Sequence, residues 1–181
     1  GFINVCDSIE GVPLAFISIV KKNGYRSFEI STSDYSYLQL SYKMGIPRLY
    51  SIYSLSKPTG PSNRLAYGGG LGTRFPFDEE FSLNLELSAH QIFWINEPET
   101  DDFLHTDRLN MVNQIKAIFS KNVLDDASLF IAPTFNVGVS NDKKYGKNIG
   151  EDLMPYWKIN PVNSDKTRVR LWFGFSTGIS F

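Results

Sequence analysis

The C-terminal segment, residues 167–181, constrains the fold of this chain more than any other stretch. Its odd-numbered positions from Val169 to Phe181 are all apolar or threonine, whereas its even-numbered positions carry arginine, tryptophan, glycine or serine. Successive side chains of a β-strand point to opposite faces of a sheet. The pattern therefore predicts a strand with one apolar face and one polar or small face, ending on the aromatic Phe181.

Strand signals recur along most of the chain. The predicted strands are residues 26–32, 35–44, 47–56, 63–75, 80–92, 108–120, 128–140 and 167–181. In 80–92, Phe81, Leu83 and Leu85 alternate with serine, asparagine and glutamate. Apolar residues of 108–120 also fit helical spacing, but Ile115 and Phe119 fit alternation, so we favour a strand there. In 128–140, Pro133 removes a ladder donor and suggests a bulge or weak pairing.

The connections between these strands fall into two groups. In an up-and-down arrangement, connections 33–34, 57–62, 93–107 and 141–166 lie at one rim, and two of them are long. Connections 45–46, 76–79 and 121–127 lie at the other rim, and all are short. Short turns at one rim and long loops at the other are typical of transmembrane barrels. The sequence therefore predicts an all-β fold, an antiparallel up-and-down β-barrel of about eight strands.

The last strand resembles the closing strand of bacterial outer-membrane β-barrels, which characteristically end on Phe after alternating apolar residues. The resemblance implies an outer-membrane location and recognition of the Phe181 strand by the barrel assembly machinery. Residues 2–5 (FINV) recur as residues 16–19 (FISI), each followed by polar residues and a glycine. With YRSFEIS at residues 25–31 and LFIAPTFNVGVSN at 129–141, this resembles a family of Bacteroidetes surface proteins with a short repeat before the barrel and no settled activity.

We therefore divide the chain into a repeat-like segment, residues 1–24, and a β-barrel domain, residues 25–181. The alternative for the first segment is an ordinary hairpin turning at Asn23-Gly24. Gly1 opens on a strand-like segment without a signal peptide, so an exported protein would be a mature or trimmed form.

Composition narrows the function classes. A chain of 181 residues suffices for one domain. The net charge of −1 gives no electrostatic reason to expect nucleic acid as a partner. Aromatic residues are abundant, with 14 Phe, 9 Tyr and 3 Trp, as an interfacial belt requires. Cys6 is the single cysteine, so no internal disulfide forms. No apolar run reaches the length of a transmembrane helix.

Charged residues on the small, polar faces predict a network inside the barrel. The residues are Glu29, Glu86, His90, Lys116, Arg168 and Arg170. We expect His90 and the two arginines to share a level near the rim with the long loops, and Glu86 to lie lower, closer to Lys116. Because isolated charges in a narrow lumen are costly to desolvate, these groups should be paired or hydrated and should close the lumen.

Signals for chemistry are sparse. Ser88, His90 and Glu86 resemble the Ser, His and Glu of some small outer-membrane lipid hydrolases, although alternation produces this spacing by chance. Two distant histidines, His90 and His105, without a cysteine cluster argue against a transition-metal site. The carboxylates of Glu97, Glu99, Asp101 and Asp102 could supply oxygen ligands to calcium, although the regular loop spacing is missing. Gly68 to Gly72 lacks the ending of a phosphate loop, and its glycines fit relief of crowding in a narrow barrel. We expect no catalysis, no cofactor and no metal.

Alternation alone leaves the inside face undecided. If the apolar faces point outward, the protein contacts outer-membrane lipid and has a structural or surface-interaction role. If they point inward, it is a soluble lipocalin-like barrel for a small apolar ligand. In the first case the long loops offer a contact surface for a protein or glycan partner, with a mixture of aromatic and basic side chains: Tyr145, Tyr156, Trp157, Lys143, Lys144 and Lys147.

Overall fold

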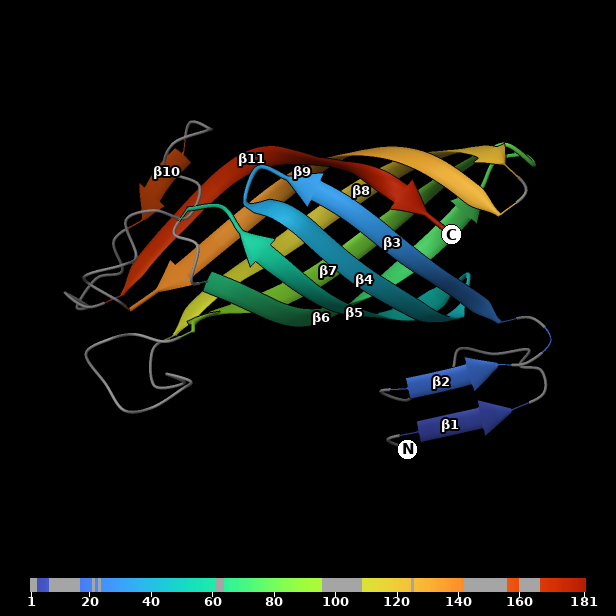
Figure 1. The fold of residues 1–181 in the computed structure, drawn as a ribbon, viewed down its shortest axis with the longest axis horizontal. Coiled ribbons are helices and arrows are strands. Elements are labelled where there is room, and N and C mark those ends of the chain that lie inside the picture. The colour runs from blue at the N-terminus through green and yellow to red at the C-terminus, as the bar shows by residue number, and fades with distance from the viewer. Residues whose placement is uncertain are drawn as a thin grey trace.

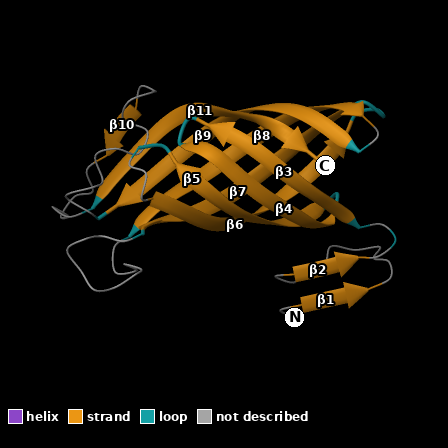
Figure 2. Ribbon diagram, in the orientation of Figure 1, coloured by secondary structure: helices purple, strands orange, loops and turns teal. Residues whose placement is uncertain are grey.

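The computed structural model describes residues 3–6, 17–20, 22, 24–60, 64–95, 109–124, 126–141, 156–159 and 167–181. All its regular elements are β-strands, as Figure 2 shows. Within this described part, no helix is long and apolar enough to cross a membrane.

Eight antiparallel strands form a closed barrel, seen from the side in Figure 1. They are β3 (Tyr25–Ser33), β4 (Ser36–Ile46), β5 (Leu49–Pro58), β6 (Arg64–Pro76), β7 (Phe81–Trp94), β8 (Asn110–Leu124), β9 (Ala127–Ser140) and β11 (Arg168–Ser180). Each pairs with its neighbour in sequence, and β11 closes the barrel by pairing with both β9 and β3. The predicted up-and-down barrel and its eight strands are confirmed, and residues 110–124 are strand rather than helix.

One strand of the large sheet escaped the sequence analysis. β10 (Tyr156–Ile159) pairs with β11, with Trp157 opposite Leu171. β10 and β3 pair with the same edge of β11. β10 pairs near the start of β11, and β3 pairs near its end. Four residues inside a long connection are too few for alternation to identify a strand.

The N-terminal segment contains a second, two-stranded sheet. β1 (Ile3–Cys6) and β2 (Ile17–Val20) pair in parallel, with Ile3 opposite Ile17 and Val5 opposite Ile19. This register places the two copies of the short repeat side by side. Among the described residues β2 pairs with β1, and β3 pairs with β4 and β11, so the described strands on either side of Gly24 do not pair with each other. β2 contacts β4 and β5 from outside the barrel.

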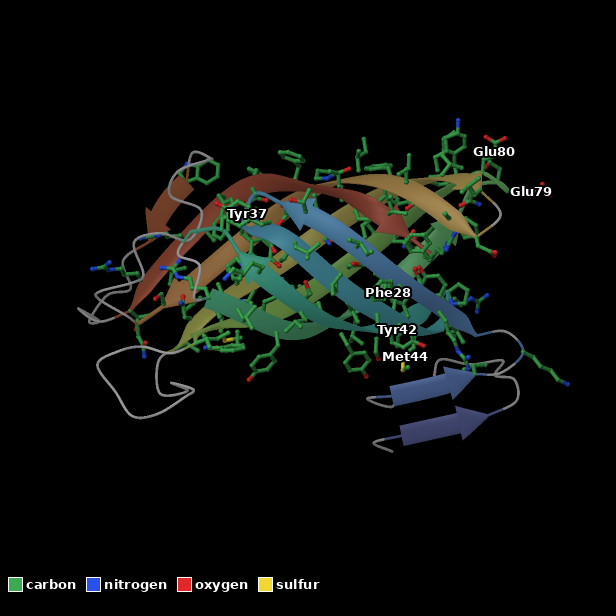
Figure 3. All side chains as sticks on the ribbon, viewed as in Figure 1. Phe28, Tyr37, Tyr42, Met44, Glu79 and Glu80 are labelled. Atoms are coloured by element: carbon green, nitrogen blue, oxygen red, sulfur yellow. The ribbon has the colours of Figure 1, made fainter. Side chains whose placement is uncertain are left out.

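The polar faces of the barrel strands point inward and the apolar faces point outward. Along β7, Ser82, Asn84 and Glu86 are buried, whereas Phe81 and Leu85 are exposed. The outward faces of the other strands are apolar as well, although their inward faces also bury apolar side chains such as Ile52 and Ile118. Figure 3 shows outward side chains such as Phe28, Tyr37 and Tyr42 on the barrel wall. Exposed outward residues of the wall include Ile30, Leu55, Tyr67, Leu71, Phe75, Leu87, Ile115, Phe119, Ile131, Phe173 and Phe175.

The strand ends define two rims. The strand ends on either side of Pro47–Arg48, of 77–80 and of the step from Leu124 to Ala127 lie at the rim that also holds the C-terminus (Figure 1). The strand ends that the long connections join, from β7 to β8 and from β9 to β11, lie at the other rim. The first short turn comes two residues later than the predicted 45–46. Gly45 instead lies within β4, one residue before its end, with a φ of 150°, and an added Cβ there would meet the backbone of Leu49 and Tyr50.

Pro133 interrupts pairing without a bulge. The register of β8 and β9 is the same at Lys116–Thr134 and at Phe119–Ile131, but the two pairs between them, which include Pro133, are missing. Because proline has no N–H to donate, the ladder loses bonds there while the alternation of faces continues.

Glycines of β6 make room for large lumen side chains. An added Cβ at Gly72 would lie 2.4 Å from the Tyr50 ring, and one at Gly68 would lie 2.5 Å from the His90 ring. The expectation that these glycines relieve crowding inside a narrow barrel therefore fits the packing.

We predict that Gly72→Ala lowers the free energy of unfolding by about 1–3 kcal/mol, because the new methyl group displaces the Tyr50 ring from a filled lumen. Gly69→Ala is the matched control, since the nearest atom to its added Cβ is the Ile52 carbonyl oxygen at 3.2 Å. Unfolding in denaturant measures both. Equal stability of the two variants would contradict the packing described.

Candidate functional site

A cluster of charged groups occupies the middle of the lumen. Lys43 Nζ lies 2.5 Å from Glu29 Oε2 and 2.6 Å from Glu86 Oε1. Lys116 Nζ lies 3.6 Å from Glu29 Oε1. Tyr50 donates its hydroxyl to Glu86 Oε1 at 2.8 Å. All five side chains are buried, and the two carboxylates balance the two ammonium groups.

The small diameter of the barrel and the register of its strands bring these residues together. Tyr50, Gly72, Glu86 and Lys116 are opposite one another in successive strands β5 to β8, so they form one row around the wall. Glu29 on β3 and Glu86 on β7 lie on non-adjacent strands, yet both contact Lys43. An eight-stranded barrel is just wide enough for its interior to be filled by side chains, which allows such contacts across the lumen.

A second polar cluster lies nearer the rim with the long connections. His90 Nε2 is 2.8 Å from Ser54 Oγ, and His90 Nδ1 is 3.3 Å from the Tyr35 hydroxyl. Tyr35 donates to Gln39 Oε1 at 2.9 Å. The apolar residues Ala66, Ile92, Val112 and Trp172 pack with Tyr35. Both ring nitrogens of His90 are thus engaged, and the lumen is filled at this level too.

Asp34, in the turn between β3 and β4, joins this end of the barrel to β11. Its Oδ2 accepts a hydrogen bond from Trp172 Nε1 at 2.5 Å and one from Asn136 Nδ2 at 3.5 Å. Gly174 leaves the space that its carboxylate fills, since an added Cβ would lie 2.2 Å from Oδ1. Oδ1 is buried without a partner. Burial raises the pKa of Asp34 above 3.8, and the bond from Trp172 only partly opposes this.

The residues predicted for the lumen lie on inward faces. Glu29, Glu86, His90, Lys116 and Arg170 are buried, and Arg168 is half-buried at the start of β11. His90 and Arg170 belong to one row through Val112 and Gly138, as expected, whereas Arg168 lies in a different row, opposite Ser140. Glu86 is opposite Lys116 in register, but its ion pair is with Lys43, and Lys116 pairs with Glu29.

Sequence reasoning missed Lys43, Tyr50 and Asp34. The sequence does contain a signal for Lys43. It lies on the same face of its strand as the polar residues Gln39 and Ser41, whereas Tyr42 lies on the opposite face. Tyr50 lies in a segment with apolar residues on both faces, where parity gives no assignment. Asp34 lies in a turn, and only the tertiary fold brings it to Trp172.

The residues of the hydrolase alternative do not form a relay. Ser88 faces the lumen beside them, but the ring of His90 contacts Ser54 and Tyr35, and Glu86 contacts Lys43 and Tyr50. A Ser-His-Glu mechanism needs the hydroxyl and the carboxylate on the two ring nitrogens. The buried histidine here is held by other partners.

Much of the predicted loop surface lies outside the described residues. This applies to Tyr145, Lys143, Lys144 and Lys147, to the side chain of Tyr156, and to the acidic stretch with Glu97, Glu99, Asp101, Asp102 and His105. Trp157 is described: its side chain is exposed and meets the Phe173 ring edge-on at 5.9 Å. Among the residues for which positions are given, no group of three or more His, Cys, Asp or Glu could hold a metal ion.

We find no protein-family model, curated protein or solved structure that the chain matches.

We predict that Lys43→Met lowers the free energy of unfolding by about 3–5 kcal/mol, because it leaves two buried carboxylates with Lys116 alone. Adding Glu86→Gln should recover part of this loss by restoring one carboxylate to one ammonium. Arg48→Met, at an exposed turn, is the control and should change stability by less than about 0.5 kcal/mol. A double variant as unstable as the sum of the single ones would contradict the coupling.

The raised pKa of Asp34 predicts a pH dependence. The folded protein holds the proton more tightly than the unfolded chain, so the contribution is present below pH 3.8 and is lost as pH rises through the higher folded pKa. Asp34→Asn should remove this part of the slope in plots of unfolding free energy against pH. Parallel slopes for wild type and Asp34→Asn would refute the assignment.

Proposed function

We propose that this protein is an integral outer-membrane β-barrel with a closed lumen and a structural or surface-interaction role. The observation that carries the proposal is the orientation of the two faces: apolar side chains cover the outside of the wall and charged groups pair inside it.

The outer wall has the character of a lipid-facing surface. Leu87, Ile131 and Phe173 each expose more than 60% of their surface, and similar side chains surround them on every strand of the wall. Monomeric soluble proteins rarely expose contiguous apolar patches beyond a few hundred Å². A closed barrel also satisfies its backbone hydrogen bonds internally, which a hydrocarbon environment demands.

Strand lengths and aromatic positions support the same environment. A strand tilted in a bilayer needs about 9–11 residues to span it, and the eight barrel strands have between 9 and 15. Exposed aromatics lie near both ends of the wall, with Tyr37 and Tyr67 toward one rim and Phe75, Phe81 and Phe181 toward the other. Such girdles are typical of the two membrane interfaces.

The position of Phe181 in the structure suits a C-terminal signal for barrel assembly. The backbone N–H of Phe181 donates to the Phe28 carbonyl at 2.8 Å, and the Phe28 N–H donates back at 2.9 Å. Phe181 thus belongs to the seam where the last strand meets the first barrel strand. Recognition of this strand by barrel assembly machinery, implied by the resemblance, would precede formation of that seam.

The charge-paired lumen supports a structural or surface role over the alternatives. A lipocalin-like carrier needs an apolar interior, whereas the described interior holds two ion-paired carboxylates. A lipid hydrolase needs an accessible nucleophile beside its histidine, whereas the partners of His90 are buried. The long connections and the exposed Trp157 leave the loop rim as the place for a protein or glycan partner.

A bilayer assay tests the proposal. We expect the refolded protein to insert into vesicles, to show a heat-modifiable band in detergent, and to pass no steady current in single-channel recordings. Leu85→Arg, at an outward position in the middle of β7, should destabilise the inserted protein by about 2–4 kcal/mol. Full solubility without detergent would refute the membrane assignment, and steady conductance would refute the closed lumen.

A further inference from the structure

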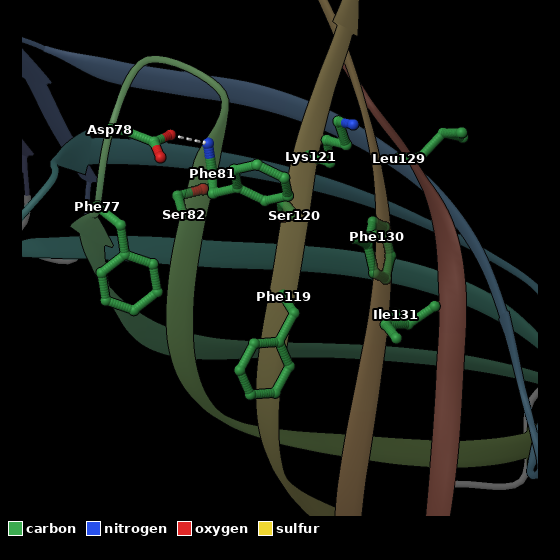
Figure 4. A pocket seen from close by; sticks show the side chains of 10 residues that line it. All are labelled: Phe77, Asp78, Phe81, Ser82, Phe119, Ser120, Lys121, Leu129, Phe130 and Ile131. Carbon is green, nitrogen blue, oxygen red and sulfur yellow. Dashed lines mark hydrogen bonds between the residues drawn. The ribbon is translucent and has the colours of Figure 1, made fainter.

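One part of the outer wall is hollow rather than smooth. A groove of about 550 Å³ opens near the rim with the short turns (Figure 4). Its walls are Phe77, Phe81, Phe119, Leu129 and Ile131, all exposed and apolar. The groove is also bordered by Ser82, Ser120 and Phe130. Because the side chains of these three residues are buried, the backbone of their strands forms the floor of the groove.

The volume and the lining suit a hydrocarbon chain. Small-molecule sites in proteins typically have about 300–1,000 Å³ and are lined mostly by apolar and aromatic groups. The groove is also continuous with the lipid-facing wall, because Phe119 and Ile131 belong to the outward faces of β8 and β9. A single acyl chain could enter it from the bilayer without leaving an apolar environment.

Charged groups of both signs gather at the end of the groove nearest the rim. Lys121 lies over the Phe81 ring, with Nζ at 5.3 Å from the ring centre. The turn that holds Asp78, Glu79 and Glu80 lies beside it, because Asn122 donates its backbone N–H to the Glu80 carbonyl at 2.7 Å and its side-chain amide to the Glu79 carbonyl at 2.6 Å. Lys121 and the acidic turn 78–80 thus lie at the same end of the groove, and all four residues are exposed.

The turn itself is held in place. Asp78 Oδ1 accepts the backbone N–H groups of Glu80 at 2.8 Å and of Phe81 at 2.6 Å. The backbone of the acidic turn beside Lys121 is therefore fixed, and Lys121 is exposed. An ammonium group and nearby carboxylates complement a headgroup that carries one phosphate and one amine.

From this geometry, and resting on the proposed membrane location, we propose that the groove is a specific site for a zwitterionic phospholipid. One acyl chain lies between Phe77, Phe119 and Ile131. The phosphate binds Lys121, and the headgroup ammonium faces the carboxylates of the 78–80 turn.

Native mass spectrometry with dioleoylphosphatidylethanolamine as the probe tests this site. The wild-type barrel, inserted in nanodiscs that contain the probe, should retain one lipid after release. Ile131→Trp fills the groove and Lys121→Gln removes the phosphate contact, and each should lower retention about tenfold or more. The matched controls are Ile115→Trp, an exposed outward position on β8 outside the groove, and Arg48→Gln, an exposed cation at the same rim; both should retain lipid as the wild type does.

Dioleoylglycerol, which has the same chains without the headgroup, should not be retained. Equal retention of the two lipids would overturn the phosphate contact, and equal retention by wild type and Ile131→Trp would overturn the groove site. A barrel that inserts and is heat-modifiable, yet retains the probe no better than Ile131→Trp, leaves the membrane function intact and removes only this site. Failure of the protein to insert into the membrane at all would overturn both the membrane function and this lipid site.

Discussion

Closure of β11 onto β3 is the interaction on which the rest of the structure depends. Without it, β3 and β11 would each leave a row of unpaired backbone groups at the edge of a long sheet. With it, the eight strands form a ring, and the reciprocal bonds between Phe28 and Phe181 complete the seam at its last residue. Closure also separates two environments, because each strand then presents one face to a narrow interior and the other to the surroundings.

The narrow interior determines its own chemistry. Side chains as large as Tyr50, His90 and Trp172 fit only because glycines face them on β6 and β9. Charges in such a space have no room for a full hydration shell, so they must neutralise one another. Lys43 does this by contacting carboxylates from both sides of the lumen. The same paired groups that hold the strands together also fill the space through which solutes would otherwise pass.

Alternation along single strands predicted much of this fold. It identified the eight barrel strands and placed Glu29, Glu86, His90 and Lys116 on one set of faces, because a strand repeats every two residues wherever its faces differ in polarity. It could not say which face is inside, since soluble and membrane barrels use the same pattern with opposite orientation. That answer needed the three-dimensional burial of residues such as Glu86 and the exposure of residues such as Leu87.

Contacts across the lumen were beyond sequence reasoning for a different reason. Pairs such as Lys43–Glu86 and Asp34–Trp172 depend on the shear and diameter of the closed barrel, which no local pattern records. The groove at Phe119 and Ile131 depends likewise on how three strands and one turn meet at the rim. A four-residue strand such as β10 was missed because its pattern is too short to differ from chance.

Spin labels on the outward face of β7 test the central claim most directly. We would place single labels at Leu83, Leu85 and Leu87 in vesicle-inserted protein and measure collision with oxygen, which concentrates in hydrocarbon, and with a water-soluble nickel chelate. A lipid-facing wall predicts high oxygen collision and exclusion of the chelate at all three positions. High collision with the chelate at Leu85 would contradict the account, because it would place the middle of the apolar wall in water.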